Sequence, residues 1–175
     1  METNLSELFP VVDKDGLTIG QATRKECHSG SFLLHPVVHL HVLNTNKELY
    51  LQKRSMNKDI QPGKWDTSVG GHIDFGEEIQ HALHREAYEE LGMSEFSPIF
   101  IEKYIHTSAF ESELVYCFYT IYDGIITPDP IEISEGRFWK IEEISQSLNE
   151  NIFTSNFSHE FKHLISNLVH IKKLD

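Results

Sequence analysis

The sequence lacks an apolar run of about 18 residues, the minimum for a membrane-spanning helix, and it lacks a basic and then apolar beginning. It therefore predicts neither a membrane span nor a signal peptide. Cysteine is scarce as well, because Cys27 and Cys117 are the only two, which is typical of a reducing compartment and provides no disulfide framework. These absences favour a cytoplasmic enzyme of bacterial type.

Positive charge is also in short supply. The chain has 15 Lys and Arg against 27 Asp and Glu, which gives a formal net charge of −12. Nucleic acids and membrane surfaces are anionic and repel such a chain. The composition therefore predicts no nucleic-acid partner and no membrane partner, and we attribute part of the acidic excess to a metal site.

Length and apolar content suit one domain over residues 1–175. Hydrophobic residues make up 39% of the chain and include 11 Phe, enough for a substantial core. Residues 1–30 are expected to form an N-terminal β extension, with a hairpin over residues 11–24 that turns at Asp15-Gly16. Further strands are predicted at residues 36–43, 48–53, 67–69, 98–107, 114–122 and 137–140.

Helical spacing occurs at residues 77–91 and 141–148, and residues 157–173 are predicted to form a C-terminal helix. Strands and helices therefore alternate without internal repeats. This order predicts an α+β fold in which helices cover the faces of a mixed central β-sheet.

The most specific pattern lies in residues 71–93, where carboxylates, an arginine and glycines stand at fixed spacings. The pattern comprises Gly71, Glu77 after five residues, Arg85-Glu86 after seven more, Glu89-Glu90 and Gly92. Its apolar residues recur every four positions, at Ile79, Leu83, Ala87 and Leu91. This recurrence predicts an amphipathic helix that Gly92 ends.

Three carboxylates crowd one edge of this predicted helix. At about 100° per residue, Glu86, Glu89 and Glu90 fall within one sector. Such crowding is repulsive unless a cation is present, and hard oxygen ligands suit Mg²⁺ or Mn²⁺ bound together with phosphate oxygens. Arg85 is spaced to pair with Glu77 or Glu89. The alternative is a solvated, salt-bridged helix face, against which the positions of the glycines argue.

The whole pattern resembles the Nudix box, and every defining position is filled. The resemblance implies a Nudix αβα sandwich with a mixed sheet. It also implies a hydrolase in which water attacks a phosphorus of a nucleoside diphosphate derivative. Glu86, Glu89 and Glu90 would then hold divalent ions, and Glu77 and Arg85 would orient these ligands at the metal site.

The general base varies in position across Nudix enzymes. Glu89 is one candidate, and Glu135, in a predicted loop, is the other. The sequence does not choose between them.

A second resemblance covers residues 10–145 and concerns the Nudix branch of type I isopentenyl-diphosphate isomerase. It rests on residues 13–16, Gly20, Arg24, and residues 28–35, 52–54 and 62–66. In that isomerase three His and two Glu bind a metal, and the matching residues here are His28, His35, His72, Glu111 and Glu113. Glu90 matches the ligand of its second metal, Arg54 and Lys58 match its diphosphate-binding cations, and Nudix proteins of this kind often form a homodimer.

The His and Glu positions admit two interpretations. Imidazoles and carboxylates together would suit Mn²⁺, Zn²⁺ or Fe²⁺ better than Mg²⁺, and alternate residues His35, His39 and His41 place imidazoles on one face of a strand. The other interpretation is that these side chains only make hydrogen bonds. Arg54 and Lys58 likewise either contact phosphate or are solvated.

Two departures from the isomerase favour the hydrolase. The isomerase needs a catalytic Cys directly before the glycine that opens the box, and that position is Gly70 here. Isomerases of this type also have a degraded Nudix box, whereas this box is complete. The sequence therefore favours a pyrophosphohydrolase for a small-molecule diphosphate, with an isopentenyl-diphosphate isomerase or a non-catalytic diphosphate-binding regulator as alternatives.

Overall fold

The computed structural model describes residues 7–58 and 60–171, so that residues 1–6 of the predicted extension and residues 172–173 of the predicted C-terminal helix lie outside it. Its strands are β1 (Leu8–Val12), β2 (Thr18–Thr23), β3 (Leu34–Leu43), β4 (Leu49–Arg54), β5 (Trp65–Asp66), β6 (Val69–His72), β7 (Ile99–Thr107), β8 (Ser112–Ile121) and β9 (Ile133–Trp139). Its helices are α1 (Arg24–Cys27), α2 (Ile79–Leu91), α3 (Ile141–Ser147) and α4 (Ser155–Ile171).

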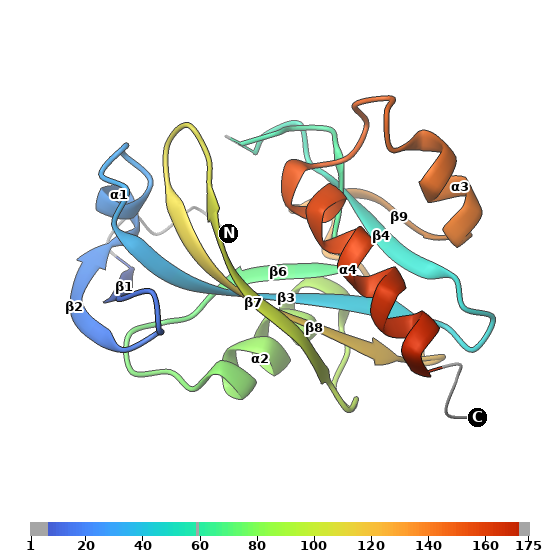
Figure 1. The fold of residues 1–175 in the computed structure, drawn as a ribbon, viewed down its shortest axis with the longest axis horizontal. Helices are drawn as coiled ribbons and strands as arrows, with labels where there is room; N and C mark the ends of the chain where they lie inside the picture. The colour runs from blue at the N-terminus through green and yellow to red at the C-terminus, as the bar shows by residue number, and fades with distance from the viewer. Residues whose placement is uncertain (1–6, 59, 172–175) are drawn as a thin grey trace.

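The central sheet is mixed, as predicted. Its main order is β5-β4-β3-β8-β7, with β3 and β8 parallel and the other neighbours antiparallel. The strands β6 and β9 pair with β3 and β4, and β1 with β2 form a separate two-stranded sheet at one end of the molecule (Figure 1). The predicted α+β class is confirmed.

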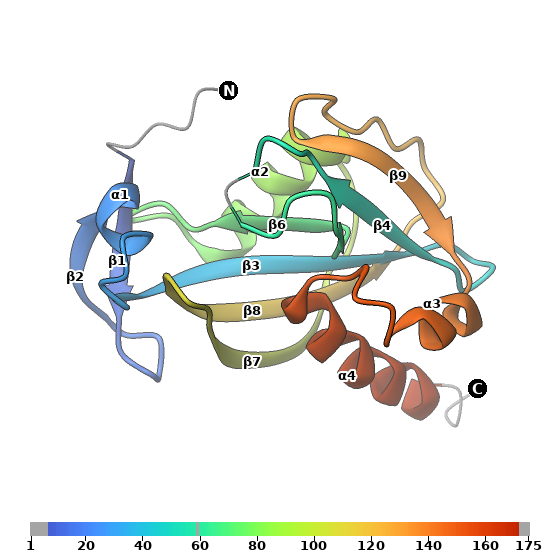
Figure 2. The same ribbon diagram turned by 90° about the horizontal axis from the view of Figure 1, so that it is seen from above.

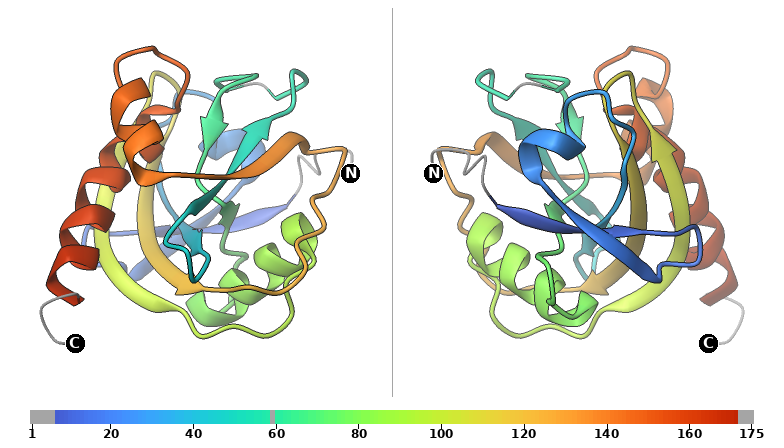
Figure 3. Two further views of the ribbon diagram at one scale, coloured as in Figure 1. Left: turned by 90° about the vertical axis from the view of Figure 1, so that its right-hand side faces the viewer. Right: turned by 90° about the vertical axis from the view of Figure 1, so that its left-hand side faces the viewer.

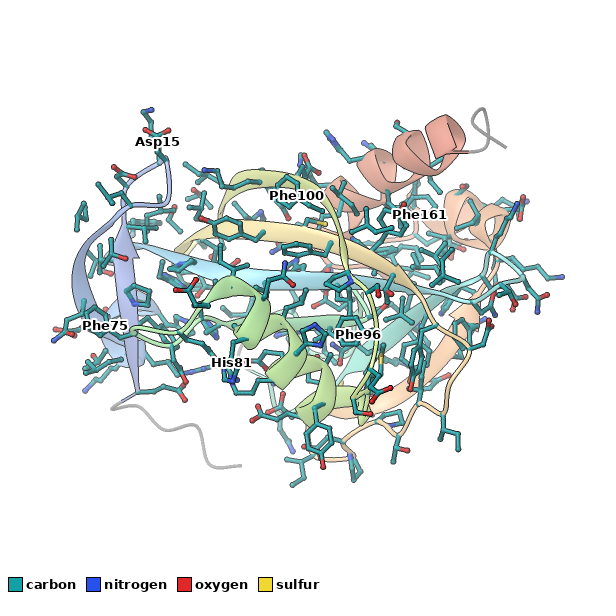
Figure 4. All side chains as sticks on the ribbon, turned by 90° about the horizontal axis from the view of Figure 1, so that it is seen from below. Asp15, Phe75, His81, Phe96, Phe100 and Phe161 are labelled. Carbon is teal, nitrogen blue, oxygen red and sulfur yellow. The ribbon has the colours of Figure 1, made fainter. Side chains whose placement is uncertain are left out.

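Helices cover both faces of the central sheet. Figure 2 shows α2 on one side of the sheet and α3 and α4 on the other, and the end views in Figure 3 show the sheet curving between them. Alternate residues of β3 explain the arrangement, because Val38, Leu40 and Val42 pack toward α2 while Leu43 belongs to the core under α4. Phe161, labelled in Figure 4, is 3% exposed in that second core.

The box helix forms where its apolar spacing predicts. Leu83, Ala87 and Leu91 are fully buried against the sheet, and Gly92 ends α2 in the left-handed conformation with φ of 68°. In contrast, His81 on the outer side of α2 has a side chain that is 74% exposed (Figure 4). The amphipathic pattern thus orients the acidic edge of this helix.

The strand predicted at residues 67–69 is wrong in its position. Two strands, β5 and β6, flank Thr67 and Ser68 instead. The Ser68 hydroxyl accepts from the Val42 amide at 2.8 Å and donates to the Tyr50 carbonyl at 2.5 Å. A side chain therefore bridges β3 and β4 where backbone pairing would otherwise continue.

Several other boundaries also differ from the prediction, including the start of the box helix, which lies at Ile79 rather than at residue 77. Arg24, expected in a strand, begins α1, because Thr23 and Glu26 form a capping box there. Strand β9 begins four residues earlier than predicted, at Ile133, and α4 begins at Ser155. Within the described part of the chain, no helix has the length and apolar character to cross a membrane.

Replacing Leu83 with Ala tests the packing of the box helix. We expect Leu83→Ala to lower the free energy of unfolding by about 2–5 kcal/mol, because it leaves a cavity under α2. The matched control is Tyr88→Ala on the same helix, where the side chain is 64% exposed and a change within about 0.5 kcal/mol is expected. Urea denaturation measures both, and equal effects would contradict the assigned faces.

Candidate active site

A cavity of about 590 Å³ lies where the sheet divides. Two strands pair with the same edge of β3: β6 pairs with Val37–Leu40, and β4 pairs with Val42–Leu43. The cavity wall includes residues of both partner strands, among them Gly70 and Gln52. It also includes the acidic edge of α2, which the sheet division leaves uncovered.

The three carboxylates predicted on one edge of α2 all line this cavity. Glu90 is 7% exposed and its Oε2 accepts from the Gln52 side chain at 3.0 Å and from the Gly70 amide at 3.2 Å. Glu86 is nearly buried and Glu89 is the most open of the three. Two of these carboxylates thus face the cavity from a largely dry environment.

Arg85 connects the carboxylates to the loop and to β6. It donates to Glu77 from Nε at 2.9 Å and from Nη2 at 2.8 Å, to Glu86 at 2.7 Å and to Glu89 at 3.3 Å. It also donates to the His72 carbonyl at 2.9 Å. Burial raises the pKa of Glu77, but the bonds from Arg85 outweigh it and lower that pKa to about 2. Pairing of Arg85 with Glu77 and Glu89, predicted from spacing, is confirmed.

Repulsion among the remaining carboxylates is compensated only in part. Burial raises the pKa of Glu90 to about 8, and the charges of Glu86 and Glu132 add to this effect. Burial likewise raises the pKa of Glu86 to about 7, although Arg85 opposes the rise. A divalent cation at this place would remove the repulsion, so the residues fit the predicted Mg²⁺ or Mn²⁺.

The glycine that opens the box allows the close approach of Glu86. A Cβ atom at Gly71 would overlap the Glu86 carboxylate. Any side chain at this position would therefore push that carboxylate out of the cavity.

The two candidate general bases lie in different surroundings. Glu89 lines the cavity. Glu135 was expected in a loop but lies within β9, where its exposed side chain is 3.6 Å from Lys53, and it is outside the cavity wall. Glu132, which sequence analysis missed, lines the cavity instead and shares a small side pocket with Glu86, Glu89 and Glu90.

The structure brings together all five residues of the second predicted site. His28 Nε2 lies 3.1 Å from His72 Nε2 and 3.2 Å from Glu111 Oε2. Ligand atoms of His28, His35 and His72 lie within 4.8 Å of one another, and so do those of His35, Glu111 and Glu113. His35 is therefore the residue common to both groups.

The chemistry of this cluster fits a transition metal. His35 Nε2 is buried and has no hydrogen-bond partner among the described residues, and the buried Glu111 Oε2 lies against His28 Nε2. Burial keeps the pKa of His72 well below its usual value, with Arg24 adding to the effect, so that the imidazole is neutral as a metal ligand must be. Burial and Glu113 raise the pKa of Glu111 to about 7.

The predicted phosphate-binding cations line the cavity but already have partners. Arg54 donates to Asp66 at 2.9 Å and to the Ile60 carbonyl at 3.0 Å. Lys58 donates to Glu132 at 2.9 Å. A diphosphate would therefore compete with Asp66 and Glu132 for these two cations.

Comparison with known proteins places this geometry in a family. Residues 33–161 match the model of the NUDIX domain. The chain belongs to this family. A solved structure, DR0079 from Deinococcus radiodurans, has the same fold, with a TM-score of 0.78 over 89% of this chain and 98% of that chain at 22% identity.

Curated relatives carry two kinds of names. Isopentenyl-diphosphate Delta-isomerase 1 of Photorhabdus laumondii is 30% identical over 172 residues, which cover 94% of this chain and 97% of that protein. An uncharacterized Nudix hydrolase of Nostoc is 38% identical over 87 residues, which cover 50% of this chain and 52% of that protein. The similarity thus extends both to isomerases and to hydrolases of the family.

Stability should fall with rising pH in the presence of a chelator. The folded chain holds protons on Glu86 and Glu90 that the unfolded chain, with ordinary carboxyl pKa values near 4.5, has released. Because the folded state binds more protons between these values, stability is fully present below about pH 4.5 and is lost as pH rises through the folded pKa values of about 7 and about 8. Urea midpoints in EDTA measure this slope, which Glu90→Gln should flatten. An equal slope in both proteins would contradict the raised pKa of Glu90.

Proposed function

We propose that this protein is a metal-dependent hydrolase that cleaves the pyrophosphate linkage of a nucleoside diphosphate derivative or a related diphosphate. The observation that supports it is the convergence of Glu86, Glu89, Glu90 and Glu132 on one cavity beside the glycine backbone of β6. These carboxylates would hold Mg²⁺ or Mn²⁺, which would supply charge neutralisation at phosphate oxygens and activation of water. Only a small molecule fits a cavity of about 590 Å³.

The residues of this chain have separate tasks in the proposal. Glu86 and Glu90 hold the cation, and Arg85 and Glu77 fix the direction of the carboxylates from behind. Glu89, which is exposed to the cavity, is the candidate acceptor for the proton of the attacking water. Arg54 and Lys58 exchange their carboxylate partners for the diphosphate.

The second candidate function is isomerisation of isopentenyl diphosphate, supported by the assembled His and Glu cluster and by the similarity to isomerases. Against it stands Gly70, which provides no thiol where the resemblance requires a Cys. Both cysteines of the chain, Cys27 and Cys117, are buried, and burial raises the pKa of the Cys27 thiol to about 11. Neither is among the cavity-lining residues.

Replacement of Glu90 tests the hydrolase. A panel of nucleoside triphosphates, sugar nucleotides and dinucleoside polyphosphates is assayed for phosphate or nucleotide release with Mg²⁺ and with Mn²⁺. We expect metal-dependent cleavage of one class, lost in Glu90→Gln and reduced about 10- to 100-fold in Glu77→Gln, because Glu77 only orients the site. The exposed Glu95→Gln is the matched control. Full activity in Glu90→Gln would refute the assignment.

The isomerase alternative is tested with isopentenyl diphosphate in D₂O. We expect proton NMR to show no allylic isomer with the wild-type protein, in Mg²⁺ or in Mn²⁺, because position 70 provides no thiol. Isomer formation that disappears in Glu113→Gln would instead establish the second candidate. The Glu95→Gln variant again controls for changes in surface charge.

A further inference from the structure

His39 of β3 has a place in the cavity that neither predicted metal site explains. It is 8% exposed and lines the cavity, whose wall also includes residues of β6 and Asn156 at the beginning of α4. Its Nδ1 lies 2.6 Å from Oε1 of Glu160, which is fully buried under α4. One nitrogen of the imidazole is therefore committed to a carboxylate 121 positions away in sequence.

The carboxylate of Glu160 also contacts two other side chains. The Tyr104 hydroxyl donates to its Oε1 at 2.7 Å, and His41 Nε2 lies 3.0 Å from its Oε2. Burial raises the pKa of Glu160, but His39 and His41 outweigh it, so this pKa is far below its usual value and the carboxylate is ionised. An ionised carboxylate in a dry environment strongly orients and charges the imidazole beside it.

The charge on His39 follows from this contact. Burial alone lowers the pKa of His39, but Glu160 outweighs it, with Glu113 and Asp66 in support, and the pKa rises to about 9. His39 is therefore an imidazolium at neutral pH, with both ring nitrogens as donors.

The other edge of the imidazole faces the position of Gly70. A Cβ atom added at Gly70 would lie 3.3 Å from His39 Cδ2 and 3.4 Å from His39 Nε2. Both residues line the cavity, and Gly70 also donates its amide to Glu90. The absence of a side chain at position 70 thus leaves space beside His39 Nε2 in the cavity that Glu90 also lines.

We propose that His39 is a substrate-binding residue whose Nε2–H donates to an oxygen of the bound diphosphate beside Gly70, and that Glu160 is its positioning residue. This inference rests on the proposed function, because it takes a diphosphate as the ligand. It also assigns a consequence to Gly70 besides the loss of a thiol: only a residue without a side chain leaves this donor uncovered. A charged donor aimed at a phosphate oxygen in a dry site binds more strongly than a neutral one.

The test uses the full chain and methylenediphosphonate, a diphosphate that is not hydrolysed, with Mg²⁺ in calorimetry. His39→Asn retains a donor near the Nδ1 position and removes Nε2. We expect the Kd of this variant for methylenediphosphonate to rise about tenfold, as for the loss of a hydrogen bond between charged groups. Glu160→Gln, which keeps the shape and removes the charge, should also weaken binding. His84→Asn, on the other side of α2 against Phe96, is the matched control and should bind as wild type.

The variants of His39 and Glu160 change a buried pair and could misfold. Two further measurements distinguish misfolding from the loss of one contact. In ¹⁵N-labelled wild-type protein, the Nε2 resonance of His39 should shift on addition of methylenediphosphonate while Nδ1 keeps the signature of its bond to Glu160. Gly70→Ala changes no charge, keeps the amide donor to Glu90, and should weaken binding by crowding His39.

The outcomes separate the two proposals. The role of His39 is overturned if His39→Asn and Gly70→Ala bind methylenediphosphonate with the Kd of the wild-type protein and the His39 Nε2 resonance does not shift. The hydrolase proposal then still stands. Absence of binding by the wild-type protein overturns the role of His39, whereas the hydrolase proposal falls only if the cleavage assays with Glu90→Gln also fail.

Discussion

The guanidinium of Arg85 holds together a site whose carboxylates repel one another. It joins Glu77 and Glu86 with bonds of 2.7–2.9 Å and reaches the carbonyl of His72 in β6. One planar cation thereby ties the acidic helix to the loop before it and to the sheet. It does not reach Glu90, whose pKa burial and the neighbouring carboxylates raise to about 8, and a cation bound at this place would relieve that repulsion.

The division of the sheet beside β3 provides the space for that chemistry. Ser68 bridges β3 and β4 through its hydroxyl, and the strands then separate around the cavity. Even-numbered residues of β3 build the core under α2, whereas His35 and His39 stand on the opposite face. A complete hydrolase box and an isomerase-like His and Glu cluster consequently adjoin one strand, and both contribute to the wall of the same cavity.

Local patterns predicted much of this arrangement. The four-residue recurrence from Ile79 to Leu91 and the glycine after it define α2, because helix geometry and a left-handed C-cap depend on neighbours in sequence. The pairing of Arg85 with Glu89, four residues along the helix, follows from the same geometry, whereas Glu77 meets Arg85 from the loop before α2. The five residues of the second site came from a resemblance, since they lie in four separate segments that spacing alone does not bring together.

The sequence by itself therefore determined the box helix, the edge on which its carboxylates stand, and most of the strands that precede and follow it along the chain. Only the tertiary structure decided that Glu132 rather than Glu135 reaches the cavity, because β9 begins between them and its alternation turns Glu135 to solvent. It also decided that Glu160 meets His39, a contact between α4 and β3. Contacts of this kind depend on how the layers pack, and layer packing has no fixed spacing in the chain.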